Sequence, residues 1–451
     1  MFLKYKTHIR IPATMALTLL IAFALNRPVL SQNVKVLTID DAIQLAKKNN
    51  SDLLIAKMNK MQADEKVSEV YSNNLIPNLS LSSSYMRNFK KQFYDISLFG
   101  QQFSFSLLTD NVVTATLQVS EPIPILGTPV FSGIRIAETY SKLQDETVNQ
   151  TEFKIKADVR KAFLNVLLLK EVVALNSFSL QDAQENLRVV ESRYKTGIVT
   201  EFDFIRAQVK VETLKPGLSQ AENNLTISKK FLKNTIGLKT DEDIDVKGTL
   251  DFDSTEVYTA STDGIVRKIT EGSVAVRQLN LSRSLNEELV KVDRSALLPK
   301  FYLFGSYGLQ ALQDDGRSLL KFPFQTGISA GLGLSWDLNF IGNKYKMNQS
   351  AIEVKKTDEQ IANVKDRLKT QTQSILLRLE DARNRIIAQA QTVKMAEKGL
   401  ELANSSFKSG VINQIDVLEA ELGLNQVKLA YLQAIFDYLN AKIELEQLLE
   451  K

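Results

Sequence analysis

One stretch of this chain occurs twice, and that repetition constrains the fold more than any other feature. Residues 193–208 read RYKTGIVTEFDFIRAQ, and residues 406–421 read SFKSGVINQIDVLEAE, 213 positions later. A lysine, a glycine, an aspartate and an alanine recur at matching places, and most other pairs are conservative replacements. The segments LIPNL at 75–79 and LLPKF at 297–301 repeat as well. The chain is therefore a tandem duplication, and each repeat is a half-molecule too large to be a solenoid unit.

Each repeat is expected to contain a helix, two strands, a long helix, a tight turn and a returning helix. The stretches 132–196 and 345–409 contain no proline and one glycine each, so each predicts a helix of about 65 residues. At about 1.5 Å per residue such a helix is roughly 100 Å long and must pack along its neighbours. Returning helices are predicted at 201–235, with a kink at Pro216, and at 414–449.

The second long helix carries an apolar stripe with the spacing of a coiled coil. The stripe runs from Ile361 to Phe407 in steps of three and four residues, with Thr372 filling one position. An average step near 3.5 residues is the period of a coiled-coil seam. Taken alone, such a stripe is more often a plain bundle core than a functional feature.

Four segments alternate apolar residues with small or polar ones, at about 79–88, 112–121, 301–310 and 327–337. Strands of roughly ten residues with one apolar face fit a transmembrane β-barrel, although two half-buried hairpins of a soluble domain would show the same alternation. Four strands cannot close a barrel, and an open sheet edge is not stable in lipid. If these strands span a membrane, several chains must share one barrel.

The chain is expected to divide into a signal peptide at 1–31, a first repeat at 32–236, a linker at 237–262 and a second repeat at 263–451. The first 31 residues combine basic residues, an apolar run and a small residue before a plausible cleavage point. A membrane anchor is the alternative interpretation, but the run is short for a spanning helix. Removal of its four basic residues takes the formal charge from +4 to zero, so no nucleic-acid partner is indicated.

The composition argues against an enzyme and against a cofactor. The chain has no cysteine, and its one histidine, His8, lies in the signal peptide. A zinc site of ordinary ligands, a cysteine nucleophile and a Ser-His-Asp triad therefore have no residues to build them. No glycine-rich phosphate-binding motif follows a predicted strand either.

Several motifs together resemble the TolC-like outer-membrane efflux proteins. They are LTIDDAIQLA at 37–46, the two helix-ending prolines Pro77 and Pro299, QVSEPI at 118–123, and the paired turns YKTG at 194–197 and FKSG at 407–410. The resemblance implies a mostly helical fold with a transmembrane β portion: a homotrimer in which each chain gives four strands to a shared twelve-strand barrel. The long coiled-coil helices would form an α-barrel, placing the protein in the outer membrane of a Gram-negative bacterium with a large periplasmic portion.

The resemblance also implies two kinds of site residue near the turns at 194–200 and 407–413, which we call the tip turns. The first is a docking surface for a periplasmic adaptor protein, which links the channel to an inner-membrane pump of RND or ABC type. Its candidate residues are Tyr194, Lys195, Gly197, Ile198, Thr200, Phe407, Lys408, Gly410, Val411 and Asn413. Independently, the glycines suit the left-handed end of a helix, and Thr200 and Asn413 suit helix N-caps.

The second is a gate. In similar proteins acidic residues beyond the second turn ring the narrowest part of the tunnel, and by position these are Asp416 and Glu419. Six carboxylates from three chains would attract cations and raise one another's pKa. The first repeat has Asp203 and Arg206 at the matching positions, and Arg206 is expected to neutralise a neighbouring carboxylate. Asp203 and Asp416 also suit the first turn of a helix, where acids are favoured.

The leading hypothesis is a passive exit duct of a tripartite efflux or secretion system, energised by the pump. The alternative is a secreted coiled-coil protein with a structural or adhesive role. Nothing in the composition selects among drugs, metal ions and proteins as cargo.

Overall fold

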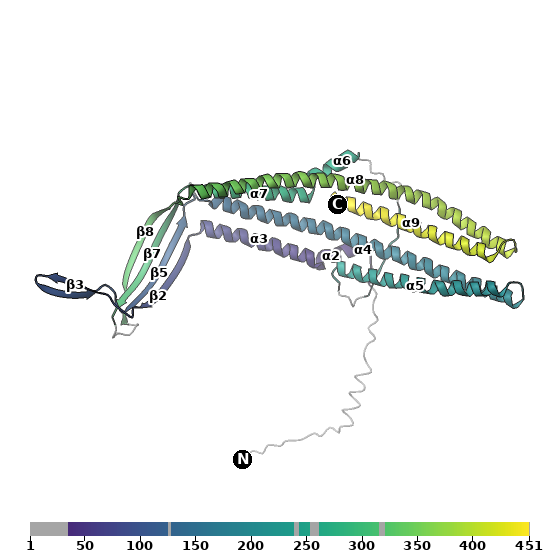
Figure 1. Cartoon of the computed structure of the whole chain (residues 1–451), viewed down its shortest axis with the longest axis horizontal. Coiled ribbons are helices and arrows are strands. Elements are labelled where there is room, and N and C mark those ends of the chain that lie inside the picture. Colours follow the sequence, from purple (N-terminus) through teal and green to yellow (C-terminus); the bar gives the residue numbers. More distant parts are fainter. Residues whose placement is uncertain (1–34, 125–127, 239–242, 253–260, 315–320, 451) are drawn as a thin grey trace, which may run out of the picture.

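The structure, a computed structural model, describes residues 35–124, 128–238, 243–252, 261–314 and 321–450. The chain is elongated, with a four-stranded sheet toward one end and long helices that run to the other (Figure 1). The expected signal peptide lies outside the described residues.

The helices follow the duplicated order that the sequence predicts. Their bounds are α2 Ile39–Asn49, α3 Ser51–Leu75, α4 Val130–Lys195, α5 Glu201–Thr235, α6 Thr262–Gly272, α7 Val274–Ser295, α8 Phe340–Lys408 and α9 Gln414–Leu448. The two long helices, α4 and α8, have 66 and 69 residues. The opening helix of each repeat is broken once, between α2 and α3 and between α6 and α7. Helix α5 continues through Pro216, so the proline does not interrupt it.

Each long helix is followed by a tight turn and a returning helix, and the two helices form a helical hairpin. Helix α4 pairs with α5 and α8 pairs with α9, and both turns lie at the end of the molecule opposite the sheet (Figure 1). The turns sit at Gly197 and Gly410, both with φ of +73°. This left-handed conformation strains most residues that have a Cβ, which explains the glycine in both copies.

The four predicted strands form one antiparallel sheet. Its strands are β2 Asn78–Arg87, β5 Asn111–Pro122, β7 Lys300–Gln313 and β8 Gln325–Ser335, in the order β2-β5-β7-β8. Each repeat contributes one adjacent pair, and the two pairs meet between β5 and β7. Strands β2 and β8 are therefore the outer edges of the sheet in a single chain.

The register gives the sheet one apolar and one small or polar face. Leu81 pairs with Leu117, Leu117 with Tyr307, and Tyr307 with Ile328. Directly opposed residues point to the same side, so these four form an apolar row across the sheet. The neighbouring row contains Ser82, Thr116, Gly308 and Gly327.

Two small strand pairings were not predicted, although a short side strand was expected within residues 244–250 of the linker. The first is a hairpin of β3 Phe93–Leu98 and β4 Gln101–Ser106, inserted between β2 and β5. The second is a parallel pair of β1 Lys35–Leu37 and β6 Ile244–Val246, which joins the start of the first repeat to the linker. In the linker, the carboxylate of Asp245 forms ion pairs with the ammonium groups of Lys170 and Lys229, both at an N–O distance of 3.0 Å. The linker is thereby attached to the first repeat.

The buried core has two parts. The first lies among α2, α3, α4 and α5 with β1 and β6, and includes Val159, Phe163 and Leu232. Helix α4 is long and apolar enough to cross a membrane by length and composition alone, but part of its apolar surface packs in this core. The second lies among α6, α7, α8 and α9, and includes Ile375 and Leu445. The middle of the predicted α8 stripe, from Leu368 to Ile386, is buried there.

Candidate functional site

The two tip turns are alike in backbone and exposure. At Gly197 and at Gly410 an added Cβ would meet no atom within 4 Å. The glycines are therefore required by the backbone conformation and not by close packing. Beside them, Ile198 and Val411 are 71% and 76% exposed, so each tip presents an apolar side chain to its surroundings.

Beyond each turn, an aspartate closes the first turn of the returning helix. The Thr200 hydroxyl donates to the Asp203 carboxylate at 2.7 Å, and the Asp203 backbone N–H donates to the Thr200 oxygen at 3.2 Å. In the second repeat, the Asn413 backbone N–H donates to the Asp416 carboxylate at 2.9 Å. Such reciprocal bonds satisfy N–H groups that the helix start leaves free. Both aspartates therefore have the structural role that the sequence suggested.

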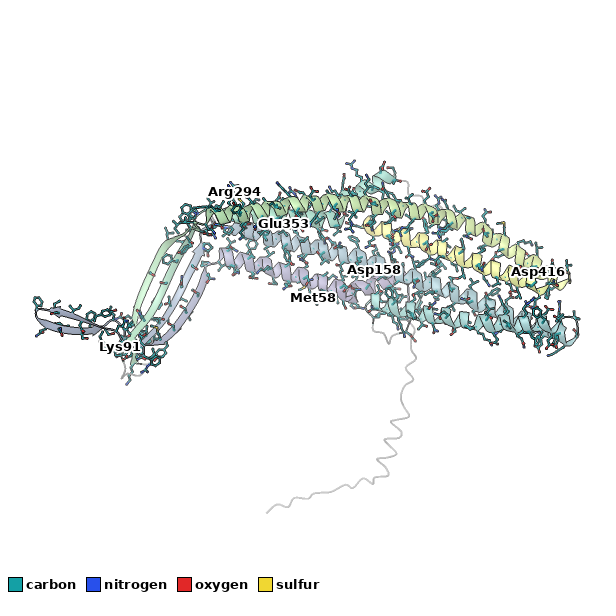
Figure 2. The ribbon with its side chains drawn as sticks, in the orientation of Figure 1. Met58, Lys91, Asp158, Arg294, Glu353 and Asp416 are labelled. Carbon is teal, nitrogen blue, oxygen red and sulfur yellow. The ribbon has the colours of Figure 1, made fainter. Side chains whose placement is uncertain are left out.

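Asp416 and Glu419 lie one helical turn apart on α9, and both are exposed. Figure 2 shows Asp416 close to the end of the helical hairpin, far from the sheet. Exposed acids this close to the tip are available to line a passage formed with other copies.

Arg206 contacts an aromatic ring. Its guanidinium lies over the ring of Phe202, 4.5 Å from the centroid. Within the described chain Arg206 is thus held by a cation–π contact, and the ion pair expected from the sequence would have to form with another copy.

Other aromatic contacts hold the tips together. Tyr194 stacks on Phe204 with ring centroids 5.2 Å apart and an interplanar angle of 3°, which joins α4 to α5. The Arg193 guanidinium lies 5.0 Å from the centre of the Phe407 ring. This second contact links the first helical hairpin to the second, directly beside both turns.

The tip lysines are solvent-facing. Lys195 forms an ion pair with Glu191 at 2.7 Å, one turn earlier on α4, and its side chain remains 70% exposed. Lys408 is the last residue of α8 and is exposed, like Lys195 at the end of α4. Cations at helix C-termini are favoured by the helix dipole, and here they also place positive charge on the outer surface of the tips.

A buried carboxyl pair behind the tips was not anticipated from the sequence. Glu421 of α9 is 8% exposed and hydrogen-bonded to Asp182 of α4. Burial, followed by this hydrogen bond and by the charge of Asp182, raises the pKa of Glu421 to about 7, against an opposing effect of Lys210. The spacing Val417, Glu421, Leu424 places Glu421 on the buried side of α9, and this helical spacing was the available sequence signal.

The next contact between the same two helices is polar too. The Asn425 side-chain amide of α9 donates to the Ser179 hydroxyl of α4 at 2.9 Å. Together these contacts form a short polar strip between the two helical hairpins. Among the described residues, no cluster of three or more His, Cys, Asp or Glu side chains suits a metal ion.

Comparison with known proteins gives matches over both repeats. A family model described as outer membrane efflux protein matches residues 42–238 and 265–450. The cobalt-zinc-cadmium resistance protein CzcC of Cupriavidus metallidurans is 25% identical over 344 residues, covering 74% of this chain and 77% of CzcC. Outer membrane protein TolC of Escherichia coli is 20% identical over 418 residues, covering 90% of this chain and 80% of TolC.

Solved structures agree in fold. The Campylobacter jejuni CmeC outer membrane channel superposes with a TM-score of 0.74 at 16% identity, covering 91% of this chain and 85% of that chain.

Proposed function

Because the chain belongs to the outer membrane efflux protein family, we propose that three copies of it form the exit duct of a tripartite efflux or secretion system. Family membership confirms the resemblance inferred from the sequence, the outer membrane location with a large periplasmic part, and the absence of enzymatic activity. Family membership also argues against the alternative, a secreted coiled-coil protein with a structural or adhesive role. The number of copies, the gate and the partners are the proposal.

The edges of the sheet are the observation that carries this proposal. Strands β2 and β8 end the four-stranded sheet, and the apolar row through Leu81 and Ile328 lies exposed on one face. A sheet with open edges is not stable in lipid, because its free backbone groups find no partners there. Pairing β2 of one copy with β8 of the next removes both edges. Three four-stranded sheets would give a closed barrel of twelve strands.

The helices extend the duct through the periplasm. The α4/α5 and α8/α9 hairpins run from the sheet side to the tips, and their exposed faces would pack around the same threefold axis to form an α-barrel. No cofactor is part of this scheme, since the duct carries out no reaction and the pump supplies the energy.

The gate of the proposed duct lies at the tips. Asp416 and Glu419 of three copies would place six carboxylates around the axis, with Asp203 and Arg206 beside them. The Arg193–Phe407 contact supports a closed state, because it ties the second helical hairpin to the first at the turn itself. Opening would require the two hairpins to separate there.

The partners follow from the exposed tip turns. A periplasmic adaptor protein would present helical hairpins to the tip turns, against Ile198 and Val411, with Lys195 and Lys408 as polar contacts. An inner-membrane pump of RND or ABC type would bind on the far side of the adaptor. Outer-membrane lipid would cover the apolar face of the barrel.

The direct test is the mass of the purified protein in mild detergent. Light scattering corrected for bound detergent should give three chains per particle, and unheated samples should migrate differently from boiled ones on a gel. A water-soluble single chain that does not enter the outer membrane fraction would contradict the proposal.

A further inference from the structure

The β3–β4 hairpin has no role in the duct as proposed above. It extends past the end of the four-stranded sheet that lies farthest from the helices (Figure 1). With the helices in the periplasm and the sheet in the membrane, this hairpin lies beyond the outer surface of the membrane. It contacts mainly itself in a single chain.

The hairpin has one apolar and one polar face. Tyr94 pairs with Phe105 and Ile96 pairs with Phe103, and directly opposed residues point to the same side. The alternate pairs are Asp95 with Ser104 and Ser97 with Gln102, with Phe93 and Ser106 at the base of the hairpin. All of the large apolar side chains on the first face are exposed in the single chain.

Phe99 at the turn is unfavourable in an isolated chain for two separate reasons. Its φ is 52° and that of Gly100 is 84°, a turn in which asparagine, aspartate or glycine normally comes first. A phenylalanine therefore strains the backbone there. The same side chain is 100% exposed. A contact that buries the ring would offset the free-energy costs of the strained backbone and of the exposed apolar side chain.

The base of the hairpin is fixed to the sheet. The Lys91 ammonium binds the carboxylates of Asp110 at 2.9 Å and Asp314 at 2.6 Å, and the Asp110 backbone N–H donates to Asp314 at 3.1 Å. Asp110 precedes β5 and Asp314 follows β7, so Lys91 joins the hairpin to the two central strands. Figure 2 shows Lys91 at this junction. These contacts tether the start of the hairpin to the end of the sheet.

The apolar face of the β3–β4 hairpin is better suited to contact with other copies of the chain than to contact with lipid. The hairpin begins beyond the spanning strands and thus outside the hydrocarbon layer. Its strands carry one charged side chain, Asp95, and two carboxylates bind the Lys91 ammonium at its base, so the strands offer no cation to the phosphates of lipid headgroups. The hairpin also continues from β2, the edge strand that meets the next copy in a closed barrel. It therefore leaves the sheet next to the strand that borders the neighbouring copy.

We propose that the β3–β4 hairpins of three copies pack their apolar faces against one another and form a cap over the outer mouth of the duct. This inference rests on the trimer of the proposed function. Two-stranded hairpins are marginal alone, and aromatic packing among three of them provides the missing stabilisation. The cap is a barrier separate from the tip gate, and it restricts entry from outside the cell.

Cysteine cross-linking tests the cap sharply because the chain contains no cysteine. Any disulfide in a single-cysteine variant must join two copies. Ile96→Cys lies on the apolar face, and Ser97→Cys, the next residue, lies on the polar face as a matched control. With a mild oxidant in purified trimers, Ile96→Cys should form linked pairs involving up to two of every three chains. Ser97→Cys should remain unlinked.

The outcomes separate the cap from the trimer. If the cysteine-free parent is not a trimer, both proposals fail. If it is a trimer and Ile96→Cys does not cross-link, or Ser97→Cys cross-links equally, only the cap is wrong.

Phe99→Asn gives a second measurement that does not depend on a disulfide. Asparagine suits the left-handed turn, so the hairpin should fold at least as well. The variant is combined with Arg193→Ala, which removes the contact that holds the tip gate closed. Compared with Arg193→Ala alone, loss of the apolar tip should raise the uptake of a large antibiotic by intact cells and raise single-channel conductance. Unchanged uptake and conductance in a variant that still forms trimers would contradict the cap.

Discussion

At the scale of single residues, Gly410 allows a test of whether adaptor binding depends on the backbone conformation of the tip turn. Its φ is +73°, and the space around its missing side chain is open. Gly410→Asn should be tolerated because asparagine adopts this conformation readily, whereas Gly410→Val should cost about 2 kcal/mol of local stability or more. We predict that the valine variant loses adaptor binding in a pull-down and that the asparagine variant retains it.

The control for this prediction is Gly399→Val, in the body of α8, where an added Cβ also meets nothing. It should leave adaptor binding intact. Loss of the trimer itself in Gly410→Val would assign the turn a purely structural role.

Asp416 and Glu419 are predicted to set the charge of the gate. The double variant Asp416→Asn with Glu419→Gln removes six negative charges from a trimer while it keeps the size of each side chain. Cation preference in planar-bilayer recordings should fall toward that of a neutral pore, because the carboxylates no longer concentrate cations there.

Asp41→Asn is the matched control, since Asp41 has the same capping role with Thr38 on α2, far from the tips. It should not change ion preference. If the double variant conducts like the parent, the gate assignment is wrong and Asp416 is a helix cap only.

Residue roles were partly accessible from the sequence. The repeated motif located the tip glycines, the caps and the exposed acids, because a left-handed glycine and a capping aspartate have local causes. The contacts of Arg206 with Phe202 and of Arg193 with Phe407 were not predicted. The second depends on how two helical hairpins pack, which no local pattern specifies.

At the scale of elements, the contact between α4 and α9 should respond to pH through Glu421. The carboxyl pair with Asp182 keeps a proton in the folded state, because burial and the neighbouring acid raise the pKa of Glu421 from 4.5 to about 7. Protonated Glu421 stabilises the folded state. This contribution to the free energy of unfolding is fully present below about pH 4.5 and is lost as the pH rises through about 7. The tips should therefore loosen toward neutral pH.

The variant Glu421→Gln removes this titration. It should be more stable than the parent at about pH 8, by an amount on the order of 2 kcal/mol, and about equally stable near pH 5. The measurement is the midpoint of thermal unfolding in detergent at the two pH values. Glu401→Gln changes an exposed acid that pairs with Lys398 and should keep the parent's pH dependence. Identical pH dependence in Glu421→Gln and the parent would contradict the assignment.

The elements themselves show where a sequence pattern is sufficient. The long helices and the four strands of the main sheet have sustained periods of about 3.6 and 2, so their existence and order were predicted. The β3–β4 hairpin alternates too, but its turn is Phe99-Gly100 and lacks the usual asparagine or aspartate before the glycine. The β1–β6 pair has three residues per strand, too few to show any period.

At the scale of the whole molecule, the duplication explains how one chain could supply a third of the proposed barrel. Each repeat gives one strand pair and one helical hairpin, and the repeats join through β5 and β7. The chain cannot close on itself, because β2 and β8 remain at opposite edges of a four-stranded sheet. The strand number alone therefore predicts closure by several copies, whereas the proposal of a cap depends on the structure of the β3–β4 hairpin.

The two faces of the sheet provide the last prediction. Leu81 and Ser82 are neighbours on β2, but Leu81 belongs to the apolar row and Ser82 to the small and polar row. In the proposed barrel the apolar row faces lipid and the other row faces the lumen. Leu81→Lys should then cost about 2–4 kcal/mol per chain near the middle of the membrane and reduce the trimer recovered from the outer membrane. Ser82→Lys should assemble normally and alter conductance instead. Equal recovery of both variants would show that the assignment of the faces is wrong.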